Sequence, residues 1–203
     1  MNRHIAFDPG AEAVSRHLAQ AMNAPAILSR FSRLVIDPNR GPDDPTLVMQ
    51  LYDGSIIPGN RRVDAAEVAR RKALAYDPYH DAITTQIDAM QARDVQPNLI
   101  AIHSFTPQLR GKDPRPWHIG VLWDRDDRLA RPLIEALAAD PEITVGDNEP
   151  YSGQLRGDCM YRHGTLRGLP HVLIELRNDL IAQPAEQMAW AARLAPLLQR
   201  LLV

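Results

Sequence analysis

His103 is the residue of this sequence whose type and position most clearly suggest chemistry. It follows the apolar residues Leu99, Ile100, Ala101 and Ile102, and Pro107 comes four residues later. An apolar run ended by proline predicts a short buried strand with the imidazole near its carboxyl end. Ligands of open α/β sheets bind outside the carboxyl ends of the strands, so a neutral imidazole there could bind a metal or carry a proton. The alternative is a structural histidine that satisfies a nearby backbone group.

A carboxylate interrupts a second apolar run. Glu175 lies within Val172-Leu173-Ile174-Glu175-Leu176-Arg177. Burying a carboxylate in a strand is costly unless it is paired, and burial raises its pKa toward neutrality, which suits a general base. The structural alternative is a salt bridge between Glu175 and Arg177, which lie two residues apart on one face of the strand.

Two further polar segments offer groups for binding a substrate. Asn39 and Arg40 follow Asp37-Pro38 after another apolar stretch. An arginine can hold a carboxylate with two parallel hydrogen bonds, and an asparagine adds donors beside it; the alternative is a simple turn with a solvated arginine. Tyr151, in the polar segment 148–153, could donate a hydrogen bond to a developing oxyanion or could cover the site without a chemical role.

The elements that must position these side chains alternate between strand and helix patterns. This alternation predicts one α/β domain, residues 1–203, with a mostly parallel sheet. A long loop over residues 37–61 and a second over 147–168 complete the pattern. Strands are predicted at 34–36, 99–103, 117–123, 143–145 and 171–176. Helices are predicted at 9–22 with Asp8 as N-cap, at 64–93 with an interruption near Asp77-Pro78, at 128–139 and at 184–202.

Composition limits the classes of function. The net charge of −2 implies no general affinity for nucleic acid or for an anionic membrane. The single cysteine, Cys159, excludes an intrachain disulfide and favours a reducing compartment, and we expect it to be a passive thiol. No apolar stretch approaches the length of a membrane-spanning helix, and the N-terminus has no apolar signal-peptide core. We therefore expect a cytoplasmic protein.

In their order along the chain, these segments resemble the zinc carboxypeptidase/aspartoacylase superfamily and, more closely, the N-formylglutamate amidohydrolase family. The resemblance runs from about Ile5 to the C-terminus. It implies a three-layer sandwich with a mixed, mostly parallel sheet of the phosphorylase/hydrolase-like (zinc carboxypeptidase-like) type. It also implies zinc-dependent hydrolysis of the amide bond of N-formyl-L-glutamate or a similar small N-acyl acidic amino acid, in amino-acid catabolism. The segments that carry the resemblance are 32–40, 102–107, 116–121 and 148–153.

The resemblance also implies roles for single residues. His103 matches a zinc ligand, and Glu175 matches the general base that takes a proton from zinc-bound water. Arg40 explains a preference for an acidic N-acyl amino acid. The residues matched to substrate binding are Asn39, Arg40, Tyr151 and Arg177.

The family pattern places two more zinc ligands upstream of the region that corresponds to Ile5, so we expect this chain to be N-terminally truncated relative to the family. The third position after His4 is Phe7, which is not a ligand, so His4 does not replace the motif. His17 and Gln20 have a spacing of three residues on a predicted surface helix and match the motif only weakly. Among the other histidines we expect no pair with ligand spacing, and His163 is the one plausible addition to the site. These histidines are His80, His118, His163 and His171.

This departure from the family pattern leaves a second function open. The chain could be a non-catalytic relative that keeps a carboxylate-binding pocket at Asn39 and Arg40 without hydrolysis. A peptidase of the zinc carboxypeptidase type is a third, less favoured possibility. A core strand missing from the sheet would leave backbone edges and apolar surface uncovered, which would favour a homo-oligomer.

Overall fold

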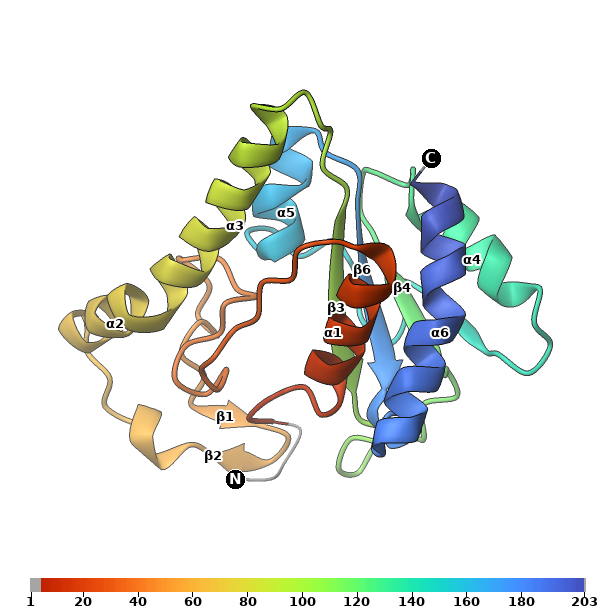
Figure 1. Cartoon of the computed structure of the whole chain (residues 1–203). Coiled ribbons are helices and arrows are strands. Elements are labelled where there is room, and N and C mark those ends of the chain that lie inside the picture. The colour runs from red at the N-terminus through yellow and green to blue at the C-terminus, as the bar shows by residue number, and fades with distance from the viewer. Residues whose placement is uncertain (1–4, 203) are drawn as a thin grey trace.

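The computed structural model describes residues 5–202 and has a mixed four-stranded sheet at its centre (Figure 1). The strand order is β3-β6-β4-β5; β3 pairs parallel with β6 and β4 parallel with β5, whereas β4 and β6 are antiparallel. The predicted three-layer α/β class with a mixed, mostly parallel sheet is confirmed. The strands are β3 (Leu99–Phe105), β4 (Ile119–Leu122), β5 (Val145–Asp147) and β6 (His171–Arg177).

Three helices cover one face of the sheet: α1 (Ala11–Met22), α4 (Ala130–Ala138) and α6 (Pro184–Leu201) (Figure 1). Alternate residues of a strand point to opposite faces, so every second residue of β6 joins the main hydrophobic core between sheet and helices. The β6 residues in this core are Val172, Ile174 and Leu176.

The opposite face carries the other set of β6 side chains, which includes Leu173 and Glu175 and borders a cavity. On this side of the sheet, the short α5 (Cys159–His163) contacts β6, and α3 (Asp77–Gln91) packs against α5. Helix α2 (Ala65–Arg71) lies farther from the sheet, before the N-terminal end of α3 (Figure 1). As predicted, α2 begins after Asp64, whose Oδ1 accepts a hydrogen bond from the backbone N–H of Glu67 at 2.8 Å. The expected interruption near Asp77-Pro78 is a change of helix type, because a π-helical segment over 72–76 leads directly into α3.

Residues 23–61 contain turns, a two-stranded hairpin formed by β1 (Leu51–Tyr52) and β2 (Ser55–Ile56), and one 3₁₀ turn. The strand predicted at 34–36 is wrong, because the segment forms turns although Leu34 and Ile36 are buried. A buried side chain, rather than a neighbouring strand, supplies hydrogen bonds to the backbone here. Asn60 Nδ2 donates to the carbonyl oxygens of Leu34 and Met49, both at 2.8 Å. The apolar run correctly indicated that this segment is buried, but it wrongly indicated a strand.

The start of α1 also differs from the prediction. The helix begins at Ala11 after Gly10, whose φ of 79° is easily adopted by glycine, and no side chain caps it. Asp8 is therefore not the N-cap; its carboxylate contacts His103 instead. No helix within residues 5–202 is long and apolar enough to span a bilayer.

Candidate functional site

The register of two parallel strands brings the two chemically most suggestive residues together. His103 of β3 is the direct neighbour of Glu175 on β6, and both side chains border the cavity. Asp8 Oδ2 lies 2.7 Å from His103 Nδ1. The next residue along β3, Ser104, donates from its hydroxyl to the carbonyl of Pro9 at 2.8 Å, which fixes the chain around Asp8 against the strand.

The imidazole of His103 lies beside two carboxyl groups, those of Asp8 and Glu175, and near the guanidinium of Arg33. Burial alone would lower its pKa, but the hydrogen bond and the charge of Asp8, helped by Glu175, raise the pKa of His103 to about 9. Burial would raise the pKa of Asp8, but His103 and Arg33 hold it below its usual value. In this arrangement His103 is an imidazolium paired with a carboxylate at neutral pH.

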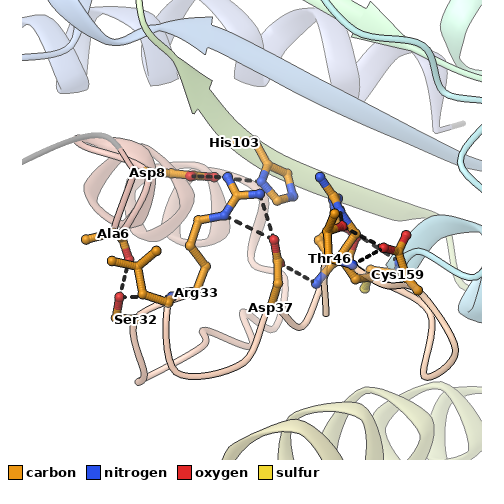
Figure 2. A network of polar contacts seen from close by, with 12 residues as sticks. Ala6, Asp8, Ser32, Arg33, Asp37, Thr46, His103 and Cys159 are labelled. Carbon is orange, nitrogen blue, oxygen red and sulfur yellow. Dashed lines mark hydrogen bonds and ion pairs between the residues drawn. The ribbon is translucent and has the colours of Figure 1, made fainter. Parts of the chain in front are cut away.

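Arg33 links this pair to the following loop. Its Nη2 donates to Asp37 Oδ2 at 2.7 Å, and its Nη1 lies 3.8 Å from Asp8 Oδ1 (Figure 2). Asp37 is almost fully buried, with 2% of its surface exposed, and its other oxygen accepts the backbone N–H of Asn39 at 2.9 Å. The ion pair therefore holds the loop that carries Asn39 and Arg40 in place.

Glu175 has a buried carboxyl group whose pKa is raised. Burial raises its pKa to about 7, although the neighbouring His103 acts in the opposite direction. Its Oε2 is buried and has no hydrogen-bond partner within the described residues. Such a carboxyl group is present in both protonation states near neutral pH, with an oxygen left for a ligand. The alternative salt bridge does not form, since Arg177 Nε donates to Asp179 Oδ1 at 2.9 Å.

A cavity of about 960 Å³ opens beside this cluster. Asn39, Arg40 and Tyr151 contribute to its wall, together with Arg33. A volume of this size accommodates a small organic substrate. Arg177, the fourth residue matched to substrate binding, is not part of the cavity wall; its guanidinium also donates to the carbonyl oxygen of Arg115 at 3.3 Å.

The residues matched to carboxylate binding are fixed by their neighbours. Arg40 donates from Nε to Thr46 Oγ1 at 3.1 Å and from Nη1 to the carbonyl of Asn39 at 2.8 Å. Asn39 Oδ1 accepts the backbone N–H of Cys159 at 3.1 Å. Both side chains are only half-buried, so a ligand in the cavity can reach the donors that remain.

Tyr151 has a partner that the sequence did not indicate. Arg115 donates from Nη1 to the Tyr151 hydroxyl at 3.1 Å, and its guanidinium carbon lies 4.9 Å from the ring centre. Burial raises the pKa of Tyr151 to about 12, so its hydroxyl stays protonated at neutral pH. The sequence did not identify three residues of the site, which are Asp8, Arg33 and Arg115. The Asp8-Pro9 pair resembles the start of a helix, so Asp8 was interpreted as an N-cap.

Among residues 5–202, the groups around His103 do not supply the three protein ligands of a zinc site. With Nδ1 against Asp8, Nε2 is the atom left for a metal, and carboxylates commonly orient metal-binding histidines in this way. A zinc site needs at least two more ligands. Within residues 5–202, the one group of three ligand atoms lying within 4.8 Å of one another is His80, Cys159 and His163. Zinc at His103 therefore stays a prediction.

No ligand spacing in the sequence joins the histidines of this group, as expected, but the fold brings two of them together. His80 Nδ1 lies 2.8 Å from His163 Nε2, across two helices that are far apart in the sequence. Cys159, expected to be passive, lies one helical turn before His163. That spacing of four residues was the signal in the sequence, because residues i and i+4 share one face of a helix.

The fold and the buried acid–base cluster at a cavity define an α/β protein of the hydrolase-like type. The model of the family described as FGase, N-formylglutamate amidohydrolase, matches residues 1–182, and the chain belongs to this family. The resemblance inferred from the sequence is thus confirmed at the level of the family.

Two solved structures are similar to the chain. The crystal structure of gene product Atu2144 from Agrobacterium tumefaciens is 38% identical, with a TM-score of 0.93, over 99% of this chain and 79% of that one. N-formylglutamate amidohydrolase from Ralstonia eutropha JMP134 is 23% identical, with a TM-score of 0.59, over 94% of this chain and 82% of that one, a likeness of fold. No curated protein matches the chain.

Proposed function

We propose that the chain hydrolyses the amide bond of N-formyl-L-glutamate, or of a similar N-acyl acidic amino acid, in the cavity beside His103 and Glu175. The observation that carries the proposal is the Glu175 carboxyl group, which is buried, has a pKa raised to about 7 and keeps Oε2 unpartnered next to the cavity. Membership of the amidohydrolase family supports the class of reaction.

In the proposed reaction, Glu175 accepts one proton from water and later donates it to the leaving amine. The carboxylate takes a proton from a water molecule while the water oxygen bonds to the amide carbon. When the carbon–nitrogen bond breaks, the protonated Glu175 gives that proton to the leaving amine, which yields formate and glutamate from the formyl substrate. The His103 imidazolium, held by Asp8, stabilises the negative charge that develops on the carbonyl oxygen.

Substrate selection is assigned to Arg40 and Tyr151, which also line the cavity. Arg40 is oriented by Thr46 and by the carbonyl of Asn39, and it would bind the carboxylates of an acidic amino acid. The Tyr151 hydroxyl, oriented by Arg115, would donate to the substrate. The family resemblance further implies zinc dependence; the steps above use Glu175, His103 and Asp8 alone because the described residues around His103 do not supply three ligands.

Formate release from N-formyl-L-glutamate tests the proposal, in parallel assays with and without added zinc. Glu175→Gln should lower kcat by about 10²- to 10⁴-fold while substrate still binds in a calorimetric titration. Glu142→Gln, at an exposed carboxyl group outside the cavity, is the matched control and should leave kcat unchanged. Wild-type protein that binds the substrate without releasing formate, or a fully active Glu175→Gln variant, would overturn the proposal.

A further inference from the structure

A second group of chemically active side chains lies between α3 and α5 and takes no part in the proposed hydrolysis. His80 is on α3, and Cys159 and His163 are on one face of α5. All three side chains are buried, and their ligand atoms lie within 4.8 Å of one another. The nitrogen atoms that face each other in this group are His80 Nδ1 and His163 Nε2.

We propose that His80, Cys159 and His163 bind one divalent transition-metal ion of the zinc type, which joins α3 to α5. One thiolate and two imidazoles form a donor set that favours zinc or cobalt over calcium or magnesium, which prefer oxygen ligands. Three protein ligands are the number found in open zinc sites, in which a fourth position is left to water.

The geometry of the group requires small movements to accept the ion. Bonds of about 2.0–2.1 Å to nitrogen and about 2.3 Å to sulfur place tetrahedral ligand atoms roughly 3.3–3.7 Å apart. The nitrogen atoms of His80 and His163 are 2.8 Å apart, the length of a hydrogen bond between two imidazoles. Metal binding would replace this hydrogen bond, moving the two nitrogens apart by about 0.5 Å and drawing the sulfur of Cys159 inward.

The protonation states of the imidazoles favour a metal. Burial, together with the positive charge of Arg162, lowers the pKa of His80 to about 3 and that of His163 to about 4. Both rings are therefore neutral at pH 7, which is the form that binds metal ions. Burial raises the pKa of the Cys159 thiol to about 12, against the opposing effects of Tyr79 and Arg162. The ion would displace the thiol proton: the S–H bond breaks, a sulfur–metal bond forms, and one proton leaves to solvent.

An ion at this position would stiffen one wall of the cavity. The backbone N–H of Cys159 donates to Asn39 Oδ1 at 3.1 Å, and the Tyr76 hydroxyl just before α3 donates to the carbonyl of Arg40 at 2.9 Å. Both contacts connect the helices of the cluster to the loop assigned to substrate binding. Cys159 itself borders the cavity, which gives an ion a route of entry.

The test uses the full chain, stripped of metal with a chelator and then titrated with cobalt(II) or zinc(II). Cobalt should produce the charge-transfer absorption of a cobalt–thiolate bond, and zinc should remove it by competition. Zinc at about 100 times its dissociation constant should raise the folded-to-unfolded ratio about 100-fold. Cys159→Ser should abolish the absorption and His80→Gln should weaken binding at least tenfold, whereas His17→Gln on α1, outside the cluster, is the control and should change neither.

A second measurement needs no variant and so does not depend on the variants folding. Because Cys159 is the only cysteine and borders the cavity, bound zinc should slow its reaction with a thiol reagent at least tenfold. Metal titration that leaves both the thiol reactivity and the visible spectrum of the wild-type protein unchanged would overturn the proposal. Formate release measured on the same samples reports separately on the proposed hydrolysis, so that failure of one proposal is distinguishable from failure of the other.

Discussion

The ion pair between Arg33 and Asp37 gives the sharpest stability prediction, because it is largely buried beside the proposed reaction centre. The Asp37 side chain is 3% exposed and that of Arg33 is 21% exposed, and their closest atoms are 2.7 Å apart. Removing one partner of a buried pair costs about 3–5 kcal/mol, because the other charge stays buried without its counter-ion. Asp8, 3.8 Å from Arg33, partly compensates, so we expect a loss near the lower limit, about 3 kcal/mol.

The substitution Asp37→Asn isolates the charge, since an amide oxygen can still accept the backbone N–H of Asn39. Urea unfolding should show a midpoint lower by roughly 1 M, given a slope of about 2–3 kcal/mol per M. Asp127→Asn, which removes an exposed pair with Arg131, is the matched control and should cost less than about 1 kcal/mol. The double variant Arg33→Met/Asp37→Asn should be less destabilised than the sum of its single variants by about 1–3 kcal/mol. Additive losses would refute the argument, because they would show that the two charges do not stabilise each other.

Three further predictions concern the cluster, the substrate and the backbone. In metal-free protein, His80 and His163 have pKa values lowered to about 3 and about 4 from 6.5, so their contribution to stability is complete above pH 6.5 and is lost on acidification. Glu175, whose pKa is raised to about 7, gives the opposite slope over the same range, so the free energy of unfolding is compared between wild type and His80→Gln from pH 7 to 4.5. The difference between the two profiles should change by about 1.4 kcal/mol per pH unit, and a constant difference would contradict the prediction. Arg40→Met should raise KM for N-formyl-L-glutamate about 10- to 100-fold with little change for an N-formyl apolar amino acid, and equal effects on both substrates would argue against carboxylate binding at Arg40. Gly120→Ala would drive its Cβ into the carbonyl oxygen of Glu149, so the thermal midpoint should fall by several degrees, and an unchanged midpoint would show that the loop moves aside without cost.

The central strands of the sheet were predictable because they are short apolar runs with clear ends. The runs at 99–103 and 171–176 both appear as strands, extended by one or two residues. The run at 34–36 has the same apolar character but forms turns, since the side chain of Asn60 satisfies the carbonyl of Leu34 without a neighbouring strand. Apolar sequence reports that a segment is buried, and only the partners of its backbone groups decide whether it is a strand.

The two groups of reactive side chains differ in what a sequence can reveal about them. His103 and Glu175 each interrupt an apolar strand, so each is conspicuous alone, and their contact follows once β3 and β6 pair in parallel. The spacing of Cys159 and His163 shows that they share a helix face, but α5 has only five residues and lies in a segment whose polar, glycine-containing pattern predicted a loop. Their partner, His80, comes from a helix 79 residues earlier in the chain than Cys159, and nothing local connects the two. Ligands within one element can be found from their spacing, whereas a ligand that two packed helices bring together becomes visible only when the packing is known.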